Sequence, residues 1–155
     1  MLLSLVMDFN ISILIGFTST FIAQIIKVIT ILISERRFAW DRIASTGGMP
    51  SSHSAGVVAV ATSVGLIDGW NSTTFAVATT IALVVMYDAT GVRRAAGLHA
   101  EYLNVIVKEL SHIFKQDGEE QKALKTLLGH TYLQVIAGCI QGIIVAIIGH
   151  FYLLQ

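Results

Sequence analysis

The chain has 155 residues, of which 54% are hydrophobic and only 13% are charged. Soluble domains carry about 25% charged residues and disordered chains are poor in apolar residues, so both classes are excluded. Ten basic residues balance ten acidic ones, which leaves no positive excess for nucleic acid, and the single cysteine, Cys139, has no partner for an intrachain disulfide. The composition predicts one integral membrane domain.

Four apolar runs are expected to form membrane-spanning helices, at about residues 9–34, 51–67, 70–92 and 131–154. A hydrocarbon core about 30 Å thick needs roughly 20 apolar residues in a helix, and the first, third and fourth runs meet that length. The second run is short and rich in Ser, Thr, Ala and Gly, residues that let helices approach closely in lipid, so we expect an interior helix there. The predicted fold class is an all-α integral membrane four-helix bundle, forming a single domain over residues 1–155.

A turn is expected just before the second run. Residues 46–53 read Thr-Gly-Gly-Met-Pro-Ser-Ser-His, and Pro50 is the only proline in the chain. Paired glycines and a proline favour a turn, and Ser51 or Ser52 can cap the helix that follows. The sequence therefore predicts a helix N-terminus close to His53.

Between the third and fourth runs, a polar stretch at about residues 98–128 is expected to be a cytoplasmic helical segment. Apolar residues recur there at helical spacing and charged residues fill the opposite face, which is typical of an amphipathic helix on the membrane surface or against the bundle. The apolar positions are Leu103, Ile106, Val107, Leu110 and Phe114, and the polar ones are Lys108, Glu109, His112 and Lys115.

The distribution of basic residues predicts the orientation in the membrane. All ten Lys and Arg residues lie at the end of the first run, in the loop after it, or between residues 93 and 125. Those segments share one side of a four-helix bundle, and the positive-inside rule makes that side cytoplasmic, with both termini outside. We expect a protein of the plasma (inner) membrane whose polar site faces the cytoplasm.

Most side chains capable of catalysis or ligand binding lie on that same side. Helix N-termini favour an anion such as phosphate, and nearby cations do the same. Two histidines beside such a site can divide phosphoryl transfer between them, one attacking phosphorus and the other protonating the leaving oxygen. The candidates are Lys27 from the first run, Ser51, Ser52 and His53 from the second, Asp88, Arg93 and Arg94 at the end of the third, and Lys125, His130 and Gln134 around the start of the fourth.

Three strings occur in order along the chain. They are Gly-Gly-Met-Pro-Ser-Ser-His-Ser-Ala at 47–55, Tyr-Asp-Ala-Thr-Gly-Val-Arg-Arg at 87–94 and Leu-Gly-His-Thr at 128–131. Together they resemble the divergent branch of the type-2 phosphatidic acid phosphatases, which is related to acid phosphatases and vanadium-dependent haloperoxidases. The first string is highly specific, the other two add order and register, and the resemblance extends over about residues 24–142.

The resemblance implies a role for several of these residues. Lys27 corresponds to the phosphate-binding Lys of the first family motif. The family's Pro-Ser-Gly-His motif matches residues 50–53, with Ser52 in place of Gly, which implies that His53 is the general acid. His130 corresponds to the nucleophilic His of the third motif. This chemistry needs no metal and no cofactor, and we expect neither.

The chain departs from the family pattern at three positions. Ser34 stands where an Arg-Pro pair is expected, seven residues after Lys27. Gln134 replaces the Asp that orients the nucleophile; Gln accepts a hydrogen bond from imidazole but supplies no charge to stabilise imidazolium. Lys125 is the nearest cation to the position where the third motif has Arg.

A rival assignment of the third motif uses a different histidine. Arg93 and His99 have the spacing of its first half, but Leu103 then occupies the position of the acid. His130 therefore remains the preferred nucleophile.

Three functions are compatible with these residues. The first is a membrane hydrolase, a phosphatase or phosphotransferase that acts on a phosphorylated lipid or isoprenoid head group through a phosphohistidine. The second is a non-catalytic membrane protein that binds an anionic lipid or phosphorylated ligand, or assembles with a partner. The third is a small dimeric transporter, although the chain has no inverted repeat. Gly138 and Gly142 have GxxxG spacing and favour a homodimer packed through the fourth run.

Overall fold

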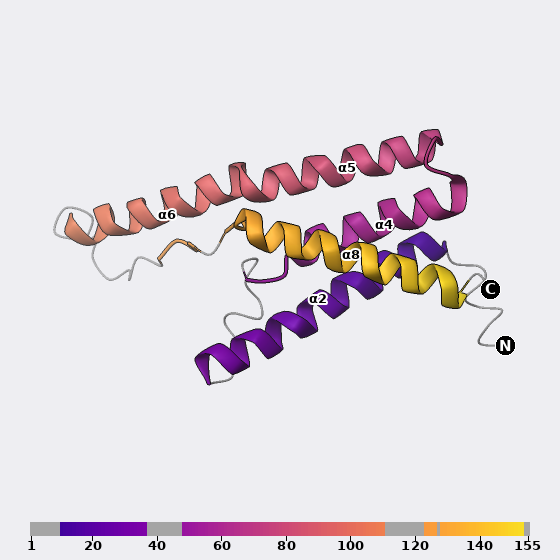
Figure 1. Cartoon of the computed structure of the whole chain (residues 1–155). Coiled ribbons are helices and arrows are strands. Elements are labelled where there is room, and N and C mark those ends of the chain that lie inside the picture. Colours follow the sequence, from indigo (N-terminus) through magenta and orange to yellow (C-terminus); the bar gives the residue numbers. More distant parts are fainter. Residues whose placement is uncertain (1–9, 37–47, 111–122, 127, 154–155) are drawn as a thin grey trace.

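The computed structural model describes residues 10–36, 48–110, 123–126 and 128–153. These residues are helical with no strand among them, as the sequence predicts. The helices are α2 (Ile11–Glu35), α4 (Ser52–Asp68), α5 (Thr73–Thr90), α6 (Val92–Glu109) and α8 (Tyr132–Leu153) (Figure 1).

Three described segments are long and apolar enough to cross a membrane. They are Ile11–Ser34, Thr73–Glu109 and Tyr132–Tyr152, of 24, 37 and 21 residues. The protein is therefore an all-helical membrane protein. The second of these segments joins α5 and α6, so the helical stretch extends well beyond the boundary at residue 92 expected from the sequence. α4 has 17 residues and falls outside this set.

α4 is the interior helix, packed against α2, α5 and α8. Nine of its 17 residues are buried, and all nine are Ser, Ala, Gly or Thr. Small side chains let neighbouring backbones approach closely, which is a main source of helix attraction where no water is displaced. The expectation of an interior helix in this run is confirmed.

The glycines of α8 pack inside the chain. A Cβ added at Gly138 would collide with the carbonyl oxygen of Ser51, and one at Gly142 with that of Ala55. The GxxxG face is thus occupied by α4 of the same molecule. This corrects the expectation that the two glycines form a dimer interface.

Hydrogen bonds link the helices across their buried faces. The hydroxyls of Ser12 and Ser63 lie 3.0 Å apart, and Ser19 Oγ donates to the Ala55 carbonyl at 2.9 Å. Gln141 Nε2 donates to the Ser19 carbonyl at 3.1 Å, joining α8 to α2. Polar groups within a bilayer must be satisfied by protein, so these bonds fix how the helices face one another.

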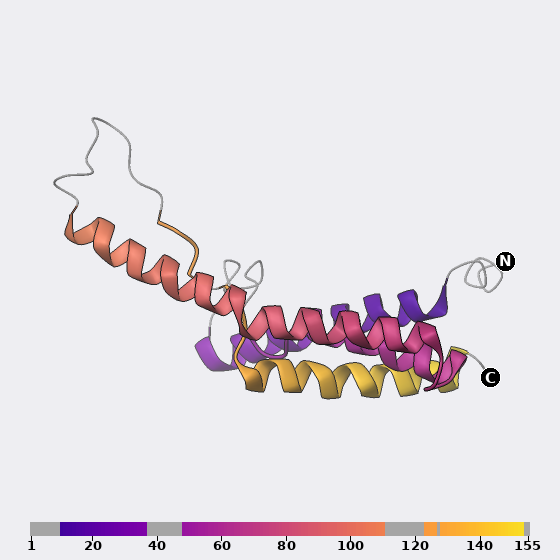
Figure 2. The same ribbon diagram turned by 90° about the horizontal axis from the view of Figure 1, so that it is seen from above.

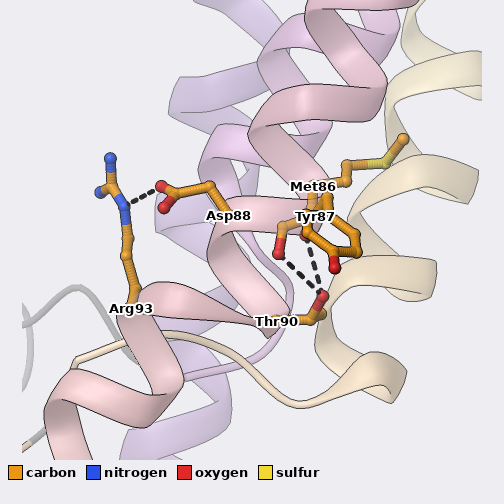
Figure 3. Close-up of polar contacts among 5 residues, drawn as sticks. All are labelled: Met86, Tyr87, Asp88, Thr90 and Arg93. Carbon is orange, nitrogen blue, oxygen red and sulfur yellow. Dashed lines mark hydrogen bonds and ion pairs between the residues drawn. The ribbon is translucent and has the colours of Figure 1, made fainter.

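α5 and α6 form a nearly continuous rod that changes direction at Gly91 (Figure 2). In the last turn of α5, the Thr90 hydroxyl donates to the carbonyls of Met86 and Tyr87 (Figure 3). α6 continues past the ends of α4 and α8 in both overall views (Figures 1 and 2).

The segment expected to be helical over 98–128 is only partly so. α6 covers its beginning and ends at Glu109, residues 111–122 lie outside the described residues, and residues 123–126 are not helical. The Asn104 side chain donates to the Leu124 carbonyl and accepts from the Leu124 N–H, both at 2.9 Å. These bonds give the Leu124 backbone an alternative to helical pairing, which is how Asn side chains commonly compete with helix formation.

Candidate functional site

Segments that are far apart in sequence meet at one end of the packed helices. The Ser51 N–H, just before α4, donates to the Gln134 carbonyl in α8 at 3.0 Å, and the His130 N–H donates to the Ala89 carbonyl in α5 at 2.9 Å. Lys27 of α2 lies against Gly48, in the turn before α4. These contacts bring Lys27, residues 48–53 and residues 130–134 to the same depth, as expected from the sequence.

His130 is held beside the first turn of α8 and is only 4% exposed. Its Nδ1 lies 3.2 Å from Gln134 Oε1, which also accepts the Thr131 N–H at 3.0 Å. Because a backbone N–H can only donate, the shared Gln134 atom is the amide oxygen, and His130 Nδ1 must be the donor. Neutral His130 therefore carries its proton on Nδ1 and a lone pair on Nε2.

The Nε2 atom of His130 is buried and has no hydrogen-bond partner among the residues that the structure describes. Burial lowers the pKa of His130, and positive charge on Lys27 and His53 adds to this effect. The hydrogen bond that His130 donates to Gln134 opposes it, as does a weaker polar contact with the Gly48 backbone. A lowered pKa keeps the imidazole neutral near pH 7, with an available lone pair. This is the state that a nucleophilic histidine requires.

Lys27 is the most deeply buried charged residue of the described chain, with 1% exposure. A Cβ at Gly48 would sit 3.2–3.4 Å from the side-chain carbons of Lys27, and Gly48 has a φ of +98°. Only glycine combines that backbone conformation with room for the lysine stem. An ionisable group inside the membrane is costly, so Lys27 is a functional candidate by default.

His53 lies in the first turn of α4 and is exposed, unlike its neighbours. Ser51 is the N-cap of α4, and its hydroxyl accepts from the Ser54 N–H at 3.4 Å and from Ser54 Oγ at 3.0 Å. Ser52 is 4% exposed. Ser51 therefore holds the end of the helix in place, and His53 faces a groove between α2, α4 and α5.

Arg93 also lines this groove, from the start of α6. Its Nε donates to the Asp88 carboxylate, and the terminal guanidinium nitrogens point away from Asp88 (Figure 3). The two side chains are 52% and 36% exposed, so the pair contributes little to stability. The bond to Asp88 uses only the Nε donor of Arg93, so its terminal guanidinium donors are not engaged by that carboxylate.

Three other candidates are not tied to this cluster by the contacts of the described residues. Arg94 and Lys125 have exposed side chains, and His99, the rival nucleophile, is exposed on α6. The backbone of Arg94 does contribute, because Gly129, with a φ of +79°, packs directly on it. Any side chain at Gly129 would collide there, so this glycine sets the approach of His130 to α5.

Sequence reasoning missed the parts of the site that are backbone or glycine. Gly48 and Gly129 both have a positive φ, and they lie shortly before His53 and immediately before His130 in the chain. The Ala89 carbonyl accepts a hydrogen bond from the His130 N–H. The glycines were visible in the strings at 47–55 and 128–131. Their contact partners come from elements distant in sequence, so nothing in those strings identified them.

The fold and the site define a class of protein. It is a helical membrane protein with a buried histidine and a buried lysine at one end of its packed helices. The chain belongs to the Divergent PAP2 family, whose model matches residues 9–145. This confirms the resemblance drawn from the three strings. The chain is also 40% identical over 147 residues to the uncharacterized membrane protein YuiD of Bacillus subtilis (strain 168), covering 90% of this chain and 93% of that protein. No solved structure matches the chain.

Proposed function

We propose that this protein is a membrane phosphatase or phosphotransferase that acts on a phosphorylated lipid or isoprenoid head group. The proposal includes a four-helix transmembrane bundle, with α4 as the fourth span, set in the plasma membrane with its site on the cytoplasmic side. Part of α6 would lie along that membrane surface. The family supports the reaction class, and the arrangement of basic residues supports the orientation.

The observation that carries the proposal is the state of His130. Its Nδ1–H is held by Gln134, and its Nε2 lone pair is buried without a partner among the described residues. A histidine that serves only to stabilise a fold normally uses both ring nitrogens when it is buried. An unused lone pair near Lys27 suits attack on a phosphorus atom whose oxygens the lysine neutralises.

In the proposed reaction, His130 Nε2 attacks phosphorus and the bond from phosphorus to the leaving oxygen breaks. Protonated His53 gives its proton to that oxygen, so an alcohol departs and the phosphoryl group stays on His130. Neutral His53 then takes a proton from water, whose oxygen attacks phosphorus and breaks the N–P bond. Lys27 and Arg93 balance the phosphate charge throughout, and Gln134 keeps the ring oriented.

A second candidate function is binding of an anionic lipid or phosphorylated ligand without turnover. The observation that favours it is Gln134 itself, because an amide accepts the Nδ1–H but gives imidazolium no counter-charge. Both candidates use the same cluster, so the presence of a covalent phosphoenzyme separates them.

The test uses the purified protein in lipid nanodiscs with ³²P-labelled phosphatidic acid and polyprenyl phosphate. The proposal predicts release of inorganic phosphate and an acid-labile labelled protein, both lost in His130→Asn and retained in His99→Asn. Binding of vanadate without any hydrolysis across the pH range would establish the non-catalytic function instead.

The phosphate-binding residues are tested by the thermal shift that phosphate or vanadate produces, since a ligand that binds only the folded state raises Tm. Arg93→Ala should reduce the shift, because Arg93 lines the groove beside His53. Arg94→Ala is the matched control and should leave the shift unchanged. Equal loss in both variants would show that only the overall positive charge matters.

A further inference from the structure

The groove that begins at His53 continues far beyond the cluster. It has a volume of about 800 Å³ and runs between α2 and α5, with α4 as its floor. Both α2 and α5 pack on α4, whereas the described parts of α2 and α5 make no substantial contact with each other. The groove therefore results from the way α2 and α5 pack on α4, and its volume lies within the range of small-molecule sites.

The two ends of the groove differ in chemistry. Arg93, His53, Ser52 and Gln24 line the end at the candidate site, and the walls beyond them are mostly apolar, including Phe17, Val57 and Ile81. Phe17 and Ile81 are 72% and 53% exposed, which places these walls at the open side, against the hydrocarbon of the bilayer. The ligand that matches has an anionic head and an apolar tail.

The groove is long enough for the tail of a lipid in one leaflet. Its lining on α2 runs from Ile13 to Gln24, eleven residues that rise about 16 Å, and along α5 and α6 it runs from Thr73 to Arg93, twenty residues that rise about 30 Å. Half of a hydrocarbon core of about 30 Å is about 15 Å. A chain that starts with its head at His53 therefore stays within the groove over at least the depth of its own leaflet.

We propose that this groove binds the hydrocarbon tail of the phosphorylated ligand, which enters sideways from the bilayer and places its phosphate at His53 and Arg93. The proposal rests on the proposed function for the identity of the head group. Helix α8 of a second copy is a poorer match for the same groove, because α8 contains no Asp or Glu that could pair with Arg93.

The test measures the affinity of nanodisc-embedded protein for butyl, octyl, dodecyl and hexadecyl phosphate. Two variants narrow the groove, Ala78→Phe and Ile81→Phe, and each has a matched control two residues away on α5 that does not line it, Ala76→Phe and Leu83→Phe. In the wild type, dodecyl phosphate should bind at least about tenfold more tightly than butyl phosphate, because more apolar surface is buried.

The ratio of the two affinities should fall by about tenfold in the narrowed variants and stay within about twofold in the controls. An affinity ratio near unity in the wild type would overturn the proposal that the groove binds the tail. An equal fall of that ratio in the narrowed and control variants would do the same. If only the proposed function is wrong, no alkyl phosphate is hydrolysed, but affinity still depends on chain length and Ala78→Phe still removes that dependence. Disulfide-linked dimers of Ile81→Cys in a Cys139→Ala background would assign the groove to a second copy and also overturn the proposal.

Discussion

Replacing Gln134 by Met should change which nitrogen of His130 carries the proton. Gln134 Oε1 now accepts from His130 Nδ1 at 3.2 Å and from the Thr131 N–H at 3.0 Å. Methionine has similar length and volume but offers no comparable acceptor. The Thr131 N–H can turn to water at the exposed start of α8, whereas the buried imidazole has no such alternative.

The size of the effect follows from those two bonds. Each contributes about 0.5–1.5 kcal/mol, so stability should fall by about 1–3 kcal/mol. The bond to Nδ1 alone biases the tautomers by about 1 kcal/mol, which is roughly a fivefold change in their ratio. Only the tautomer with an unprotonated Nε2 can attack phosphorus, so activity should fall with its population, by up to about fivefold.

The assay is ¹⁵N NMR of histidine-labelled protein, with His130→Asn to assign the signals. The wild type should show a protonated Nδ1 and an unprotonated Nε2, and Gln134→Met should move the ring toward the opposite tautomer. Gln134→Glu is the matched control: it keeps both acceptor bonds, preserves the tautomer, and raises the pKa of His130 through a charge-assisted bond. A wild-type ring protonated on Nε2, or no change in Gln134→Met, would refute the reasoning.

Burial lowers the pKa of His130 in the folded protein below its unfolded value of about 6.5. Between these two pKa values the unfolded chain binds this proton more readily, so the free energy of unfolding should decrease as pH falls below about 6.5. Urea denaturation across that range should show a shallower pH slope in His130→Asn, and an unchanged slope would contradict burial as the cause. Gly138→Leu should destabilise the protein by about 1–3 kcal/mol or prevent folding, because its side chain meets the Ser51 carbonyl, whereas Ile140→Phe on the exposed face should be tolerated in the same thermal melts. A C-terminal reporter that is active only in the cytoplasm should be silent, and strong activity would reverse the proposed orientation of the site.

Periodicity and composition alone were enough to predict the helical membrane class. Apolar runs of about 20 residues have one stable arrangement in lipid, since every backbone N–H and C=O must pair within the segment. The small residues of α4 likewise predicted its interior position, because only close packing makes use of them. The position of Lys27, near the end of its run, predicted its depth because an α-helix has a fixed rise per residue.

The tertiary structure decided what the same patterns left open. Gly138 and Gly142 give one sequence signal whether they pack within a chain or between chains, and only the position of α4 showed that they pack within it. The non-helical backbone at Leu124 depends on a bond to Asn104, twenty positions earlier, and local propensity does not register such a contact. Arg93 and Arg94 are likewise indistinguishable as neighbours in sequence, but the direction of α6 after Gly91 places only the first in the groove.

The site divides in the same way. The sequence determined its residue types: two histidines, a buried lysine and a glutamine in place of an acid. Tertiary structure decided which nitrogen of His130 is protonated, because Gln134 Oε1 accepts from both His130 Nδ1 and the Thr131 N–H. It also formed the groove, because α2 and α5 pack on α4 but make no substantial contact with each other. The chemistry of a single side chain is fixed by its residue type and can be predicted from the sequence. Geometry that requires three helices to meet depends on long-range packing, so it is defined only in the folded chain.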